Sequence, residues 1–309
     1  MYSFHLVWIL VLVHLCQVFI PDSSGWLLPP SPAHLDTAGT EIINRAGDAE
    51  GYTLFLPEQL TNKSPVVLFV HGYGCLNPMI YGAWIRHLTN KGNIVIYPRY
   101  QESIFRPSPG QFANNVATGF TKAITYLDSA GINYDLNQLA YVGHSYGGTT
   151  VAYLGAYYDS LNMPQPKVVM ACQPGTGPFK ALALESYDAI DPRIDLIVLV
   201  GQDDKTVGDE LGRRIFATAG NTNKRFIEHQ ASPEVGITAG HYEPEGLDPT
   251  LDNGDRNVSA RRALLKARVD AVDTLYWGIL DQAIQHYPDT AWWKDETAKL
   301  QFPIQLKIP

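Results

Sequence analysis

The sequence predicts one α/β domain with a mostly parallel central sheet and helices on both of its faces. Short apolar runs rich in β-branched residues alternate with longer amphipathic segments along residues 52–286. Continuous apolar runs of this kind are typical of strands buried on both faces. The chain also shows no internal repeat and no Gly/Ser linker that divides it. Its 309 residues are therefore assigned to one large domain rather than two.

Seven short runs predict the strands of this sheet. Two of them, residues 66–70 and 93–97, are continuously apolar, as expected for central strands. The seven expected strands span residues 52–56, 66–70, 93–97, 139–142, 167–171, 196–200 and 225–228.

Amphipathic segments between these runs predict the helices. In residues 112–127, for example, Val116, Phe120, Ile124 and Leu127 fall near one helical face. The five expected helices span residues 79–89, 112–127, 146–157, 210–217 and 259–286. The segment 172–193 has no strong periodicity, and a long segment of this kind often covers an active site.

Composition limits the classes of protein to which this chain can belong. The formal net charge is −8, from 23 Lys+Arg against 31 Asp+Glu, so nucleic acid is not an expected partner. Hydrophobic residues make up 45% of the chain, which is enough to bury a core and excludes a disordered protein.

The N-terminus predicts a targeting segment. Residues 6–20 are almost continuously apolar, and Pro21 ends the run. This length is typical of a signal-peptide core and is short for a membrane span. We expect residues 1–25 to be a signal peptide of a secreted protein; an uncleaved anchor over residues 4–20, with membrane association, and a buried core helix are the alternatives. Residues 26–40 then form a Pro-rich lead, residues 41–287 the domain, and residues 288–309 a C-terminal tail.

Cysteine offers little chemistry in this chain. If the N-terminal segment is removed, Cys75 and Cys172 remain, and two buried thiols are expected rather than a disulfide. Cysteine and histidine also lack the spacing of a zinc site, and no Gly-rich phosphate loop or dinucleotide fingerprint occurs. The sequence therefore predicts no metal and no cofactor.

A five-residue motif carries the strongest functional signal. Residues 143–147 read Gly-His-Ser-Tyr-Gly and lie between an expected strand and an expected helix. In this context the Gly-x-Ser-x-Gly pattern forms a sharp turn that projects the serine hydroxyl above the sheet edge, at a helix N-terminus. Glycine is needed on both sides because the turn leaves no room for side chains. Ser145 is therefore the candidate nucleophile.

A serine nucleophile needs a base, a carboxylate that orients the base, and backbone donors for the oxyanion. Asp203 and Asp204 both follow the expected strand 196–200, and either could supply the carboxylate. His241 follows the last expected strand and a loop, which is the usual place for the base, and His229 is the second candidate. The loop 71–74, His-Gly-Tyr-Gly, directly follows the strand 66–70.

These motifs together resemble the α/β-hydrolase superfamily, over about residues 40–287. The resemblance implies an acid at the third position after a strand-ending glycine, which favours Asp204 over Asp203. It also implies backbone N–H donors from Tyr73 and Tyr146, and a small cap or none. A narrower similarity, around residues 80–101, is to poorly characterised hydrolases related to dienelactone hydrolases and polyester hydrolases.

The resemblance predicts a serine hydrolase that cleaves carboxylic esters through an acyl-enzyme on Ser145, with His241 as base. Its expected substrate is a small-molecule or lipid-like ester. A peptidase or amidase on the same triad, and a catalytically silent binding protein on the same scaffold, are the alternatives. The sequence does not indicate an oligomeric state.

Two further expectations concern the surroundings of the site. Tyr73, Tyr146, Phe105, Gln173 and Phe179 are expected to form a partly aromatic pocket. The carboxylates that follow His241 are expected to disfavour anionic substrates.

Arg99 could bind a carboxylate of a ligand, and the acidic segment 243–255 could bind calcium. We expect instead that Arg99 pairs with a nearby acid, and that the acidic segment, which lacks EF-hand spacing, is a solvated loop.

Overall fold

The computed structural model describes residues 39–177, 179–220, 223–289 and 297–300. All of them belong to one compact unit that spans Ala33–Pro309. The expected targeting segment 1–25 and nearly all of the Pro-rich lead 26–40 lie outside the described residues. Within the described residues, no helix combines the length and the apolar character that a membrane span requires.

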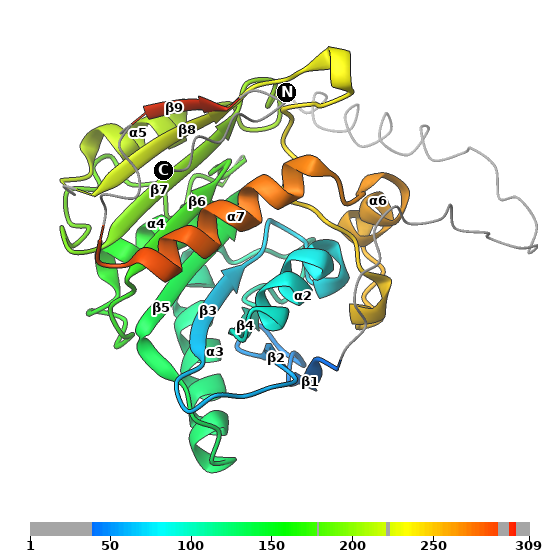
Figure 1. The fold of residues 1–309 in the computed structure, drawn as a ribbon, viewed down its shortest axis with the longest axis vertical. Helices are drawn as coiled ribbons and strands as arrows, with labels where there is room; N and C mark the ends of the chain where they lie inside the picture. Colours follow the sequence, from blue (N-terminus) through cyan, green and yellow to red (C-terminus); the bar gives the residue numbers. More distant parts are fainter. Residues whose placement is uncertain (1–38, 178, 221–222, 290–296, 301–309) are drawn as a thin grey trace, which may run out of the picture. The chain divides into compact units, whose positions relative to one another are not determined.

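A nine-stranded sheet lies at the centre of the described chain, in the order β1-β2-β4-β3-β5-β6-β7-β8-β9 (Figure 1). Its strands are β1 (Glu41–Asn44), β2 (Tyr52–Leu56), β3 (Pro65–Val70), β4 (Ile94–Pro98), β5 (Asp135–His144), β6 (Val168–Cys172), β7 (Asp195–Gly201), β8 (Lys224–His229) and β9 (Thr297–Leu300). The β1–β2 and β2–β4 pairs are antiparallel, and all the other neighbouring pairs are parallel. The expected mostly parallel sheet is confirmed.

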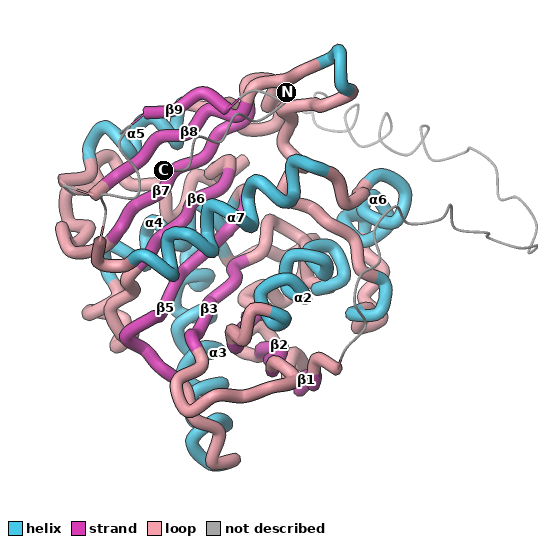
Figure 2. The backbone as a smooth tube through the Cα atoms, in the orientation of Figure 1, coloured by secondary structure: helices cyan, strands magenta, loops and turns pink. Residues whose placement is uncertain are grey.

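Helices cover both faces of this sheet (Figure 2). They are α2 (Gly82–Asn90), α3 (Phe112–Ser129), α4 (Tyr146–Tyr157), α5 (Glu210–Thr218), α6 (Val258–Lys266) and α7 (Ala271–His286). One hydrophobic core joins α3, α4 and α5 to one face of the sheet. A second core joins α2, α6 and α7 to the other face. Side chains that alternate along β3 enter the two cores in turn, with Leu68 in the first and Phe69 in the second, as the period of a strand requires.

Four elements differ from the sequence-based expectation. The long helix expected at residues 259–286 is two helices, because Ala267 has an extended backbone and Asp270 begins a new helix with a capping box to Asp273. The helix expected at 79–89 begins as the 3-10 turn Pro78–Tyr81, whose first turn is capped by Asn77. The expected tail 288–309 contains the edge strand β9, and β1 adds a short, mostly exposed strand at the opposite edge.

Leu68 provides a test of the packing at the centre of the sheet. It lies on β3 between β4 and β5 and is fully buried. Leu68→Ala leaves a cavity there, so we expect the free energy of unfolding to fall by about 2–5 kcal/mol in urea denaturation. Leu265→Ala, at a side chain that is 68% exposed, is the matched control and should change it by less than about 0.5 kcal/mol. Equal losses in the two variants would contradict this packing.

Candidate active site

Ser145 lies at the sharp turn between β5 and α4, as its motif predicts. Its backbone has φ 57° and ψ −120°, in the left-handed region that is costly for a residue with a side chain. Two hydrogen bonds from neighbouring segments maintain this conformation: the Ser145 N–H donates to Cys172 O at 2.9 Å, and the Gly175 N–H donates to Ser145 O at 3.1 Å. The strain is therefore concentrated at the residue that the sequence identifies as the nucleophile.

The turn can form only because Gly143 and Gly147, the two glycines of the motif, have no side chain. A Cβ atom on Gly147 would lie 1.9 Å from Val70 O, and one on Gly143 would lie 2.3 Å from Gly147 O. Neither position can accept a side chain without moving the backbone. Helix α4 therefore packs directly against the end of β3, and its N-terminus lies beside Ser145.

The structure brings together the three residues that the sequence proposed as a triad. His241 Nε2 lies 2.9 Å from Ser145 Oγ, and His241 Nδ1 lies 2.7 Å from Asp204 Oδ2. Each residue follows the carboxyl end of a parallel strand: Ser145 follows β5, Asp204 follows β7, and His241 lies in the loop after β8. Strands that run in parallel place these ends at one edge of the sheet, which explains how residues 96 positions apart in the sequence meet.

Asp204 is held as a buried carboxylate. Its Oδ1 accepts hydrogen bonds from the N–H groups of Thr206 and Val207, at 2.9 and 3.0 Å, while Oδ2 faces His241. Burial on its own raises the pKa of Asp204, but these hydrogen bonds outweigh it and the pKa lies below its ordinary value. The neighbouring Asp203 is exposed and makes no contact with His241 in the described chain, so the geometry favours Asp204.

The second candidate base, His229, lies elsewhere. It is buried at the end of β8, where its ring packs edge-on against Tyr276. Burial lowers its pKa to about 4. The structure therefore brings His241, and not His229, to Ser145.

The loop 71–74 lies beside the turn at Ser145, since a Cβ atom on Gly72 would lie 3.4 Å from Ser145 Cβ. The Tyr100 hydroxyl donates to His71 O at 2.7 Å, and the Gly74 N–H donates to the Gln101 side chain at 2.8 Å, so the loop is anchored on both sides. The backbone N–H groups of Tyr73 and Tyr146 have no hydrogen-bond acceptor within the described part of the chain. Both residues line the cavity at Ser145, so these two donors are available to an oxyanion there.

His144, the residue before Ser145, connects three segments of the site through hydrogen bonds. The Gly72 N–H donates to the Tyr81 hydroxyl oxygen at 3.0 Å, so the Tyr81 proton points to His144 Nδ1, 2.8 Å away. His144 Nε2 lies 2.7 Å from His241 O, which can only accept a hydrogen bond. His144 is therefore a neutral ring protonated on Nε2, and burial holds its pKa well below the ordinary value.

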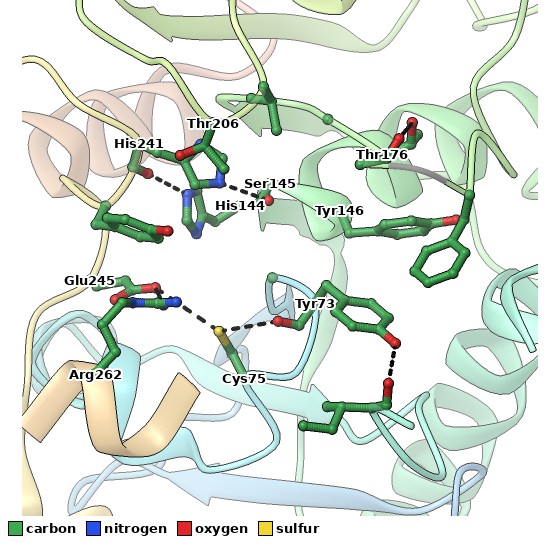
Figure 3. A pocket seen from close by; sticks show the side chains of 17 residues that line it. Tyr73, Cys75, His144, Ser145, Tyr146, Thr176, Thr206, His241, Glu245 and Arg262 are labelled. Atoms are coloured by element: carbon green, nitrogen blue, oxygen red, sulfur yellow. Dashed lines mark hydrogen bonds and ion pairs between the residues drawn. The ribbon is translucent and has the colours of Figure 1, made fainter. Parts of the chain in front are cut away.

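A cavity of about 360 Å³ opens over Ser145 (Figure 3). Aromatic rings form one of its walls. The centre of the Tyr73 ring lies 5.3 Å from the centre of the Phe179 ring and 6.3 Å from that of the Tyr146 ring. Gly175, Thr176 and Gly177 also line it, so the unpatterned segment 172–193 borders the site as expected.

Two residues of the expected pocket lie outside it. Phe105 is 84% exposed and is not among the residues that line the cavity. Gln173 is buried behind the site, where its amide donates to Gly240 O at 2.9 Å and to the Tyr276 hydroxyl at 3.0 Å. Gln173 therefore supports the backbone of the His241 loop instead of lining the pocket.

The opposite wall of the cavity is charged, which the sequence did not indicate. Arg262 Nη2 donates to Glu245 Oε1 at 2.5 Å, and the thiol of Cys75 lies 4.0 Å from the same oxygen. Burial raises the pKa of Glu245 to about 7 and that of Cys75 to about 12. Both Cys75 and Cys172 are free thiols. Arg262 therefore balances the charge of Glu245, one of the acidic residues from which the sequence predicted discrimination against anionic substrates.

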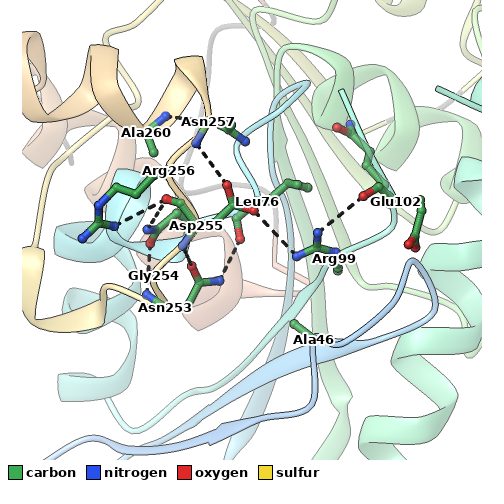
Figure 4. A network of polar contacts seen from close by, with 12 residues as sticks. Ala46, Leu76, Arg99, Glu102, Asn253, Gly254, Asp255, Arg256, Asn257 and Ala260 are labelled. Atoms are coloured by element: carbon green, nitrogen blue, oxygen red, sulfur yellow. Dashed lines mark hydrogen bonds and ion pairs between the residues drawn. The ribbon is translucent and has the colours of Figure 1, made fainter. Parts of the chain in front are cut away.

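Arg99 and the acidic segment are occupied by internal contacts (Figure 4). Arg99 Nη1 lies 3.8 Å from Asp255 Oδ2, so Arg99 pairs with a nearby acid as expected. Asp248 accepts from Arg86 Nε at 2.6 Å, and Asp252 accepts from the Asn77 amide at 2.7 Å. Over the residues that the structure describes, no three His, Cys, Asp or Glu side chains gather as a metal site would require.

One family model matches part of this chain. The family model described as Chlorophyllase matches residues 44–184, a stretch that contains Tyr73 and Ser145 but ends before Asp204 and His241. A comparison with curated proteins gives no match.

Solved structures of low sequence identity share the fold. A structure of fungal esterases from Rhizomucor miehei is 15% identical, with a TM-score of 0.51, and the match covers 81% of this chain and 84% of that one. A truncated carbohydrate esterase from gut microbiota is 16% identical, with a TM-score of 0.51, and the match covers 83% of this chain and 100% of that one.

A bifunctional GH43-CE protein from Bacteroides eggerthii is 18% identical, with a TM-score of 0.48, over 68% of this chain; the match spans only 36% of that protein. The arrangement of the sheet, the turn at Ser145 and the structural likenesses show that this chain has the α/β-hydrolase fold.

Proposed function

We propose that this protein is a serine hydrolase that cleaves carboxylic esters through an acyl-enzyme on Ser145. One observation carries the proposal: Asp204, His241 and Ser145 form a continuous hydrogen-bonded series that ends at a cavity. Two unpaired backbone donors, from Tyr73 and Tyr146, lie at the same place, within the described residues. A nucleophile, a base, an orienting carboxylate and oxyanion donors are the groups that acyl transfer requires.

The proposed reaction has two steps: acylation of Ser145, and hydrolysis of the acyl-enzyme. Ser145 Oγ attacks the ester carbonyl carbon while His241 Nε2 takes its proton, and the Tyr73 and Tyr146 N–H groups bind the oxyanion. His241 then gives that proton to the leaving alcohol as the C–O bond breaks. Water repeats the attack on the acyl-enzyme, with His241 as base again, and the acid is released. Asp204 stabilises the imidazolium that forms in each step.

The aromatic wall supports small-molecule or lipid-like esters as substrates, because Tyr73 and Phe179 present apolar ring surface to the cavity. Secretion is also a proposal: it rests on the apolar segment 6–20 of the sequence. N-terminal sequencing of the exported protein tests it, since cleavage near residue 25 is expected and an intact N-terminus indicates an anchor.

Ser145→Ala should abolish both covalent labelling and turnover, because the alanine has no nucleophilic oxygen. The measurement is labelling by a fluorophosphonate probe together with hydrolysis of p-nitrophenyl butyrate. Ser129→Ala, at an exposed serine on α3, is the matched control and should label as the wild type does. Absence of labelling in the wild type, or undiminished labelling of Ser145→Ala, would refute the proposed function.

The adjacent residues Asp203 and Asp204 allow a paired test of the acid. Asp204→Asn removes the charge that stabilises the His241 imidazolium, so we expect kcat to fall by about 10³–10⁴-fold. Asp203→Asn changes an exposed residue and should alter kcat by less than about threefold. Steady-state kinetics on one ester compares the two, and a larger loss in Asp203→Asn would reverse the assignment.

His144 is expected to act as a positioning residue. Glutamine can accept a hydrogen bond from Tyr81 and donate one to His241 O, so His144→Gln should keep most of the activity. His144→Leu leaves both partners unpaired and should lower kcat by about tenfold or more, with KM little changed. Kinetics of the two variants, with thermal unfolding measured in parallel, separates positioning from stability; similar kcat values for Gln and Leu would contradict this role.

A further inference from the structure

The cavity over Ser145 has two chemically different sides. Tyr73 and Tyr146, together with Phe179 beside Tyr73, form the aromatic wall. Glu245 and Arg262 lie on the side of His241 (Figure 3), and the Tyr242 ring contacts both His241 and Arg262. We call Tyr242, Glu245 and Arg262 the charged wall. The catalytic steps proposed above use none of them, so the charged wall is free to recognise the substrate.

Arg262 is held in a defined orientation at the charged wall. It lies on α6, its guanidinium carbon is 4.0 Å from the centre of the Tyr242 ring, and its Nη2 is bound to Glu245. Neither Nε nor Nη1 has a hydrogen-bond partner among the described residues, and of the two only Nε is buried. With 24% of its side chain exposed, Arg262 thus presents an unused donor beside the cavity.

The chemistry of the reaction indicates which part of the substrate meets this donor. His241 must hand its proton to the leaving alcohol, so the alcohol portion lies on the His241 side of Ser145. Tyr242 and Glu245 follow His241 closely in the chain, and Arg262 pairs with Glu245. The charged wall therefore adjoins the alcohol portion, and the acyl portion is left to the aromatic wall.

The charge balance of this wall allows it to accept an anion. Arg262 is the one cationic side chain among the described residues that line the cavity, and Glu245 is its counter-ion. Because burial brings the pKa of Glu245 to about 7, its carboxylate can take up a proton when a second anion approaches Arg262. Guanidinium binds carboxylate with charge-assisted hydrogen bonds, which are stronger than those to neutral carbonyl groups.

We propose that Arg262 is a specificity-determining residue that binds a carboxylate on the alcohol portion of the substrate, so that O-acyl esters of hydroxy acids are the preferred class. This assignment rests on the proposed ester hydrolysis and adds the identity of the leaving alcohol.

Two pairs of chromogenic esters test both the charge and its location. The first pair, 5-butyryloxy-2-nitrobenzoate and its methyl ester, differs by a carboxylate on the leaving alcohol. The second, 4-nitrophenyl hydrogen glutarate and its methyl ester, differs by a carboxylate on the acyl portion. The quantity measured is the ratio of kcat/KM for the free acid to that for the methyl ester, within each pair.

Arg262→Met should lower this ratio by about tenfold for the first pair and leave the ratio of the second pair within about twofold. Glu245→Gln should raise the first ratio several-fold, because the charge of Arg262 is then uncompensated. Arg261→Met removes the same charge from an exposed neighbour on α6 and is the matched control. The double variant Arg262→Met/Glu245→Gln leaves no unpaired charge and should reproduce the low ratio if the single variant folds poorly.

Three results would overturn the assignment: an unchanged first ratio in Arg262→Met, an equal fall in Arg261→Met, or a fall confined to the glutarate pair. The dissociation constant of 5-hydroxy-2-nitrobenzoate, measured by titrating it into the Ser145→Ala variant, provides a readout that does not depend on turnover. Arg262→Met added to that variant should weaken binding by about tenfold. If the methyl esters are turned over but Arg262→Met leaves both ratios unchanged, only the carboxylate site is contradicted. If the wild type shows neither turnover nor labelling, the proposed function itself is contradicted.

Discussion

The close approach of α4 to the end of β3 at Gly147 is the constraint on which the site depends. A Cβ atom there would lie 1.9 Å from Val70 O, so the helix and the strand can meet only at a glycine. This contact places the N-terminus of α4 directly above the sheet edge and forces Ser145 into a left-handed backbone. It also brings the loop after β3, with Gly72 and Tyr73, against the nucleophile turn. The strain at Ser145 is sustained because β6 and the segment after it bind its backbone on both sides.

Beside this turn, Asp204 and His144 are each held in one protonation state. Asp204 is kept ionised by two backbone N–H groups and by His241. His144 is kept neutral by burial and by an acceptor that admits only one tautomer. A charged ring at His144, with its centre 4.8 Å from that of His241, would oppose the imidazolium of the proposed mechanism. The neutrality of His144 and the charge of Asp204 therefore both favour the proposed proton transfer.

The cavity combines this fixed centre with two walls of opposite character. Aromatic rings from the loop after β3, from α4 and from the segment after β6 form the first wall. The charged wall comes from the loop after β8 and from α6, which approach each other through the Glu245–Arg262 ion pair. Both walls belong to connections at the carboxyl ends of the strands, and these connections can change without altering the sheet. Substrate preference can therefore vary in this fold while the centre is retained.

The sequence by itself determined the strand–helix series, Ser145 as the candidate nucleophile and His241 as the candidate base, and the resemblance to the α/β-hydrolase superfamily favoured Asp204 over Asp203. The candidate residues could be predicted because they depend on local patterns: apolar runs, a glycine-flanked serine, and polar residues in the loops that follow strands. The break between α6 and α7 was not predicted, because it depends on an extended backbone at Ala267 between two helical patterns. The edge strand β9 was not predicted, because it depends on pairing with β8.

Only the tertiary structure decided the polar surroundings of the site. Tyr81, His144 and the carbonyl of His241 join into one hydrogen-bond series, and Arg262 reaches a cavity centred on a serine 117 positions earlier in the sequence. The structure likewise places Gln173, which the sequence predicted to line the pocket, behind the His241 loop, where its amide donates to Gly240 O. Side-chain contacts between distant segments have no signature in local sequence, because they depend on where the sheet edge brings separate loops together.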